Sequence, residues 1–135
     1  MKIKRFEEID AWKEARILVQ LVYKAINQNT VFIKDFRLAG QIQGAAVSVM
    51  SNIAEGFSRK SHKEFIQYLF VSKSSAAEVQ SQLYVALDLN YINQTVFKEI
   101  YDQAEKISKM NSGFIKYLNS LQKQPNKPKQ PNEPT

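Results

Sequence analysis

Apolar side chains recur three or four positions apart in four long stretches of the chain, a spacing that places them along one face of an α-helix. The pattern predicts helices over residues 10–27, 35–55 and 63–89, and a fourth that starts near residue 95 and continues to residue 121. Short polar connections separate these stretches, and helices joined by short connections pack antiparallel. The chain is therefore predicted to be all-α, an antiparallel up-down four-helix bundle.

Several residues are typical of helix ends. Asp10 and Thr95 stand where the first and fourth helices should begin, so each is predicted to be an N-cap. Ser61 followed by Glu64 forms a capping box for the third helix. Gly56 suits the left-handed position that ends a helix, and it is predicted to stop the second one.

The fourth stretch carries a heptad-like stripe whose members alternate three and four positions apart. They are Phe97, Ile100, Ala104, Ile107, Asn111, Phe114, Leu118 and Leu121. Asn111 is the one polar residue among them, so it is predicted to fix the register of helix packing or to form a local hydrogen bond.

The second stretch is apolar on more than one side and rich in small residues. A helix of this kind should be covered on more than one side. It is predicted to be central within the monomer and also to line an interface between copies. The candidate interface residues are Gly40, Gly44, Val47, Met50 and Phe57.

A polar group lies at the end of the second stretch, where Asn52, Glu55 and Gly56 follow one another closely. The helix dipole disfavours a negative charge in the last turn, so Glu55 needs a nearby cation. The candidates for that cation are Arg16, Arg59, Lys60 and Lys63. One interpretation is a polar clasp that sets the angle between the second and third helices. The other is a polar rim beside phosphate contacts.

Composition argues against catalysis. The chain has no cysteine, which excludes disulfides and thiolate metal sites, and its single histidine, His62, lies in the capping box. It has no glycine-rich phosphate loop and no inward Glu-x-x-His pair of the kind that binds metals in bundles. The sequence predicts a protein that is not an enzyme and uses no cofactor or metal.

The net charge of +6 favours an acidic partner such as nucleic acid, and the alternative is a soluble protein whose exterior is simply rich in lysine. Contacts would reach phosphates without base readout, because no aromatic platform alternates with the basic residues. The candidate contacts are Lys13, Arg16, Arg59, Lys60, Lys63 and Lys73.

All four prolines lie within residues 125–135, so residues 124–135 are predicted to be a disordered tail after a bundle domain of residues 1–123. No run of 18 apolar residues could span a membrane, and the N-terminus has no apolar core of the length that a signal peptide needs. The expected location is the cytoplasm, with no membrane partner.

The block from Gln41 to Gly56, followed by Arg59, resembles a family of four-helix bundles encoded in intervening sequences of bacterial 23S rRNA genes. The resemblance extends over residues 6–122, with further matches at Asp10–Trp12, Phe65, Ser72–Ser75, Glu78, Gln82–Leu83 and Tyr91. It implies an up-down bundle assembled as a ring, typically a pentamer. The chain is also similar to the accessory variability determinant of diversity-generating retroelements, a basic barrel that binds nucleic acid and a reverse transcriptase.

Two departures from the family pattern affect these implications. Gln43 and Gly44 stand where the family has paired arginines, and Met50 replaces a proline. Any contact that the arginines make to phosphate or to a neighbouring subunit is therefore lost. Three hypotheses remain open: an oligomer that associates with RNA or DNA, a scaffold that binds a protein partner, and an enzyme.

Overall fold

The computed structural model describes residues 2–122, which form four long helices and no strand. The elements are the short 3-10 helix η1 (Phe6–Glu8), α1 (Asp10–Asn27), α2 (Phe36–Phe57), α3 (His62–Asp88) and α4 (Gln94–Gln122). These bounds agree closely with the helices that the apolar spacing predicts. The predicted tail, residues 124–135, lies outside the described residues.

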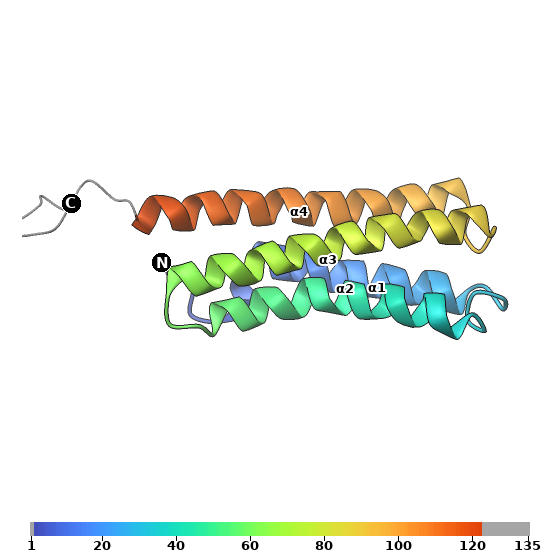
Figure 1. Cartoon of the computed structure of the whole chain (residues 1–135), viewed down its shortest axis with the longest axis horizontal. Coiled ribbons are helices and arrows are strands. Elements are labelled where there is room, and N and C mark those ends of the chain that lie inside the picture. Colours follow the sequence, from blue (N-terminus) through green and yellow to red (C-terminus); the bar gives the residue numbers. More distant parts are fainter. Residues whose placement is uncertain (1, 123–135) are drawn as a thin grey trace, which may run out of the picture.

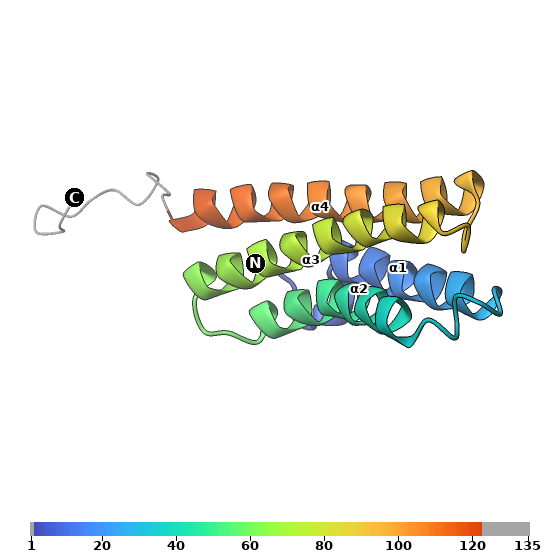
Figure 2. The ribbon, with the colours of Figure 1, turned by 45° about the vertical axis from the view of Figure 1, so that its right-hand side comes forward.

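The helices run alternately up and down and form one elongated bundle (Figures 1 and 2). Each helix packs against the next along the chain, and α1 packs against α4, whereas the backbones of α1 and α3, and those of α2 and α4, are not neighbours. The four helices therefore occupy the corners of a square in chain order. The α2–α3 connection, the start of α1 and the end of α4 lie at one end of the bundle (Figure 1). This arrangement confirms the predicted fold class.

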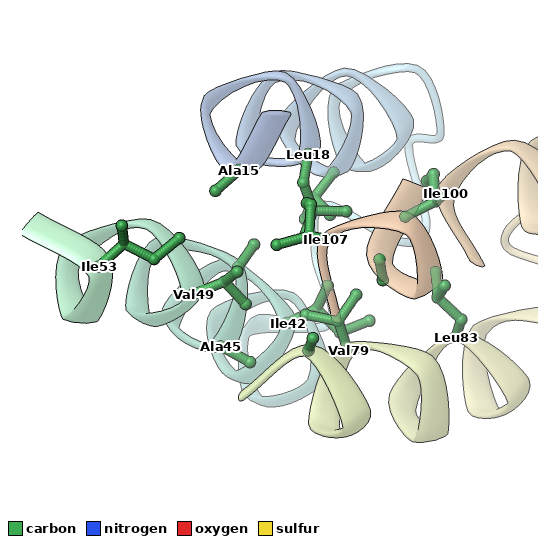
Figure 3. Packing of buried hydrophobic residues seen from close by; sticks show 14 of the residues in the cluster. Ala15, Leu18, Ile42, Ala45, Val49, Ile53, Val79, Leu83, Ile100 and Ile107 are labelled. Carbon is green, nitrogen blue, oxygen red and sulfur yellow. The ribbon is translucent and has the colours of Figure 1, made fainter. Parts of the chain in front are cut away.

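Side chains from all four helices point into a common core (Figure 3). Leu18, Val49, Val79 and Ile107 contribute one side chain from each helix and are fully buried. The predicted stripe of α4 is correct at its centre, but near its end Ile115 is buried while Phe114 is only half-buried.

Helix α2 has neighbours on two sides, because α1 and α3 both pack against it and η1 touches it as well. This position explains why its sequence is apolar over so much of its circumference. Met50 and Phe57 are half-buried against the chain's own core. These two candidate interface residues therefore already have packing partners within one copy.

Of the three predicted N-caps, only Ser61 of α3 is confirmed. The Ser61 hydroxyl accepts a hydrogen bond from the Glu64 amide at 3.2 Å, as predicted. Asp10 is not a cap, because it is already the first residue of α1 and Ile9 occupies the capping position without a side-chain bond. At α4 the cap is Asn93 rather than Thr95, since the Asn93 side-chain oxygen Oδ1 accepts a hydrogen bond from the Val96 amide at 2.8 Å.

Gly56 does not end α2 in a left-handed conformation, so that prediction is wrong. The helix continues to Phe57, and no glycine of the described residues has a positive φ. Gly56 is buried, and a Cβ atom there would lie 2.8 Å from both Phe65 Cδ1 and Tyr68 Cβ. The residue is needed because α3 approaches α2 closely at this point.

The opposite end of the bundle is closed by a bond between its two loops. The Tyr91 hydroxyl donates a hydrogen bond to the Asp35 carboxylate at 2.9 Å, and the Tyr91 ring stacks on Phe32 at 5.0 Å between centroids. The hydrogen bond to Asp35 raises the pKa of Tyr91. The same carboxylate caps α2, because it accepts the Leu38 amide at 3.1 Å.

Candidate interaction surfaces

Asn52 belongs to a polar link between α2 and α3. Its amide donates to the Ser48 carbonyl at 2.8 Å and to the Ser48 hydroxyl at 2.9 Å. The Ser48 hydroxyl in turn bonds the Ser75 hydroxyl on α3 at 2.8 Å. Asn52 therefore holds the serine that joins the two helices.

A second polar link runs through the buried core. The Ser72 hydroxyl of α3 donates to the Val49 carbonyl of α2 at 2.7 Å, and the Asn111 amide of α4 donates to Ser72 at 2.9 Å. Asn111 is fully buried, and its side-chain oxygen has no hydrogen-bond partner among the described residues. A buried polar residue held in this way favours one register of the helices over others. Asn111 therefore bonds between helices rather than locally.

Glu55 forms an ion pair with Arg59, which follows one turn later, and 2.7 Å separates the guanidinium from the carboxylate. The Arg59 guanidinium also contacts the Tyr68 hydroxyl and lies 4.8 Å from the centre of the Tyr68 ring. Arg59 is therefore engaged in joining the end of α2 to α3. The other predicted cations, Arg16, Lys60 and Lys63, form no ion pair within residues 2–122.

The six basic candidates do not form one patch. Arg59, Lys60 and Lys63 surround the α2–α3 connection, whereas Lys13 and Arg16 lie on α1, which is diagonally opposite α3 in the bundle. Lys73 lies farther along α3, with its ammonium 5.8 Å from the centre of the Phe70 ring.

Three of the five interface candidates, Gly40, Gly44 and Val47, lie exposed on α2. A Cβ atom at either glycine would meet nothing within 4 Å, so the fold of one copy does not require glycine there. Phe36 extends the same face and is 82% exposed, and Ser51 continues it at the other end. Sequence analysis missed both, although each follows from the four-residue spacing that links Phe36 to Gly40 and Val47 to Ser51.

The described residues offer no arrangement typical of catalysis. Two hollows of the surface, of about 450 and 460 Å³, are open depressions, and no group of three His, Cys, Asp or Glu side chains in residues 2–122 could hold a metal ion. His62 stands alone at the start of α3. None of the four helices is long and apolar enough to cross a membrane.

A contact between two helices shifts the pKa of one ionisable group, the Glu14 carboxylate. The Glu14 carboxylate on α1 accepts hydrogen bonds from the Lys106 ammonium at 2.9 Å and from the Gln103 amide at 3.1 Å, both on α4. The bond from Lys106, followed by that from Gln103, lowers the pKa of Glu14. This pair joins α1 to α4, so it is a link within the bundle rather than a site for a ligand.

The fold defines a class of protein, the all-α up-down four-helix bundle. In this bundle, serine and asparagine side chains form hydrogen bonds between α2, α3 and α4. Within that class, the sequence model of the 23S rRNA-intervening sequence protein family matches residues 7–113. The chain therefore belongs to this family, which confirms the resemblance predicted from the Gln41–Gly56 block.

A crystal structure from Bacteroides thetaiotaomicron VPI-5482, of a protein with unknown function from the S23 ribosomal protein family, has a similar fold. The TM-score is 0.66 at 24% sequence identity, over 78% of this chain and 94% of that chain. At this identity the likeness extends to the fold alone. A comparison with curated proteins finds no match.

Proposed function

We propose that the chain is a non-catalytic protein that assembles into a homo-oligomer through α2 and associates with the phosphates of RNA or DNA. The observation that carries the proposal is the exposed face of α2. From Leu38 to Ala54 the helix contains no charged residue, although part of its surface is open to solvent. Exposed helix faces are normally rich in charged and polar side chains.

The two exposed glycines strengthen this interpretation. Glycine inside a helix costs about 1 kcal/mol relative to alanine. Gly40 and Gly44 carry that cost without any benefit to the packing of one copy, since alanine would fit at both positions. Small residues at four-residue spacing let a second helix approach closely, as is best established for membrane helices. The family resemblance, which implies a ring and typically a pentamer, agrees with this role.

Self-association can be tested at Val47, which is 38% exposed at the centre of the face. We expect Val47→Glu to convert the oligomer into monomers, because assembly would bury a carboxylate without a partner. Light scattering after size exclusion, at tens of micromolar protein, measures the mass. Ser112→Glu is the matched control, since it adds the same charge to an exposed position of α4. Wild-type protein that remains a monomer at this concentration would refute the assembly.

The nucleic-acid part of the proposal is supported by the charge at one end of the bundle. The segments that meet there, residues 2–13, 55–66 and 113–122, contain eight basic and five acidic residues, a net charge of +3. An assembly whose copies present this end on the same side would multiply that charge. Phosphate binding would then come from counterion release and weaken steeply with salt.

Lys60 and Lys63 are exposed at this end and form no ion pair in the part of the chain that the structure describes. We expect Lys60→Ala with Lys63→Ala to weaken binding to all RNA and DNA sequences alike and to reduce the salt slope by about one per lysine. Fluorescence anisotropy over a salt series measures both. The control replaces Lys24 and Lys109, two exposed lysines elsewhere, and should retain more affinity. Equal loss in both pairs would contradict a site at this end.

One observation favours a second candidate function, a scaffold that binds a protein partner. Arg59 is held by Glu55 and Tyr68, and the remaining basic candidates are divided between α1 and the side formed by the α2–α3 connection and α3. An oligomer that assembles normally but shows no salt-sensitive mobility shift with RNA or DNA would favour the scaffold.

A further inference from the structure

Two uncharged stripes run along the outside of the bundle. The α2 stripe consists of Phe36, Gly40, Gly44, Val47 and Ser51, and the α3 stripe consists of Phe70, Ser74, Ala77, Ser81 and Val85. All ten residues are exposed. Each stripe covers fifteen residue steps, which is about 22 Å of helix.

The stripes lie at the same level along the bundle. Val49 and Ser72 are joined by a hydrogen bond and so lie level, and α2 and α3 run in opposite directions. Counting equal steps from this pair places each member of the α2 stripe level with one of the α3 stripe. The level pairs are Phe36 with Val85, Gly40 with Ser81, Gly44 with Ala77, Val47 with Ser74, and Ser51 with Phe70.

We infer that the α2 stripe of one copy packs against the α3 stripe of the next copy. This inference rests on the proposed self-association and names the surfaces that carry it. Rotation about an axis parallel to the bundle keeps every residue at its own level, so the level pairs are also the pairs that meet between copies. Gly40 then faces Ser81 and Gly44 faces Ala77, which lets the two helices approach closely at their centre.

The charges at the ends of the stripes agree with this pairing. Arg37 lies at the start of the α2 stripe, within about one turn of the level of Asp88 on α3. Glu55 lies beyond the other end of the α2 stripe, within about one turn of the level of Lys63 on α3. Opposite charges therefore meet at both ends of the contact. Pairing with the opposite polarity would place Arg37 near the level of Lys73 and Glu55 near the level of Asp88, which like-charge repulsion disfavours.

Glu78 is the one charged residue of α3 between Lys73 and Asp88. At 100° per residue its position is about 60° from the centre of the α3 stripe, on the side of the chain's own α2. The seam between copies can therefore form while this carboxylate remains at its edge.

The square arrangement of the helices limits the size of the assembly. Neighbouring corners of a square bundle point about 90° apart, so α2 and α3 each face a different neighbour. Contacts between two different surfaces give a closed ring when the rotation between copies closes and a filament when it does not. Closed rings of four and five copies have interior angles of about 90° and about 108°, so the angle between the two stripes is compatible with a ring of this size.

The main alternative is contact of two α2 stripes about a twofold axis. Such a dimer would also bring Arg37 toward the Glu55 end of its partner. It would leave the α3 stripe in solvent, with Phe70 51% and Val85 45% exposed. The head-to-tail contact covers both stripes, which is why we favour it.

Cysteine cross-linking separates these arrangements, because the chain has no native cysteine. Gly40→Cys and Ser81→Cys are made on separate chains and co-expressed, so that any disulfide between the two positions must join different copies. Oxidation and non-reducing electrophoresis should give a dimer of the two variants, whereas neither variant alone should cross-link. Gly40→Cys co-expressed with Ser112→Cys, on α4, should give no product.

The outcomes distinguish this inference from the proposed function. Cross-linked dimers from Gly40→Cys alone would overturn the head-to-tail contact in favour of the twofold one. An oligomer by light scattering without any cross-link between Gly40→Cys and Ser81→Cys would overturn the α2–α3 pairing but leave self-association intact. Variants and wild type that are all monomers would overturn both.

Discussion

Replacing Ile107 with alanine is expected to lower the free energy of unfolding by about 2–5 kcal/mol, the range for truncating a fully buried aliphatic side chain. Ile107 is 0% exposed and lies in the core beside side chains from the other helices (Figure 3). The loss combines the hydrophobic transfer of the removed atoms with the cavity left between the helices. Urea unfolding followed by circular dichroism measures the change.

Ile17 provides the matched control for this experiment. It is the same residue type in a helix, but it is 40% exposed on α1. Ile17→Ala should change the stability of one copy by less than about 1 kcal/mol, because little apolar area is lost and no cavity forms. Similar losses at both positions would contradict the packing described for α4.

Replacing Gly56 with alanine is expected to destabilise the bundle by about 1–3 kcal/mol, the cost of overpacking. Alanine is ordinarily the better helix former by about 1 kcal/mol, so propensity alone predicts the opposite sign. At Gly56 the new Cβ would lie 2.8 Å from Phe65 Cδ1 and from Tyr68 Cβ, so α2 and α3 would have to move apart. The free energy of unfolding gives the sign directly.

Gly113 is the control for the glycine prediction, since it lies inside α4 and a Cβ atom there would meet nothing within 4 Å. Gly113→Ala should stabilise the protein by about 0.5–1 kcal/mol through helix propensity. Opposite signs at the two glycines would show that contact with α3, rather than backbone conformation, requires glycine at residue 56. A stabilising Gly56→Ala would refute the close approach.

The polar links have a consequence for the proposed assembly. Ser48, Ser72, Ser75 and Asn111 connect three helices through hydrogen bonds, which favours one level of α3 relative to α2. The two stripes on the outside of the bundle depend on that level for their pairing. The internal hydrogen bonds therefore position the surface through which we propose that copies meet.

The sequence by itself determined the fold class and most helix bounds. Helical periodicity is local, because residues three and four apart share a face whatever surrounds the helix. The spacing in residues 10–27 and in the stretch starting near residue 95 was therefore enough to predict both helices. The Gln41–Gly56 block was enough to predict the family, which the match over residues 7–113 confirms.

Helix ends were harder to predict, because several residues near an end can compete for the same role. Asp10 and Thr95 are suitable caps by type, yet α1 begins without a side-chain cap and Asn93 caps α4. Gly56 matched a terminating glycine by type and position, but the chain continues in a helix beyond it. Local preference is weak enough for packing of the neighbouring helix to override it.

Only the tertiary structure decided which residues meet across helices. Glu55 forms its ion pair with Arg59 rather than with the other candidate cations, and Asn111 bonds Ser72. Met50 packs against the core of its own copy, whereas Gly40 is exposed. The physical reason is that such contacts depend on the distance, rotation and level of one helix relative to another. Periodicity within a single helix contains none of these three quantities.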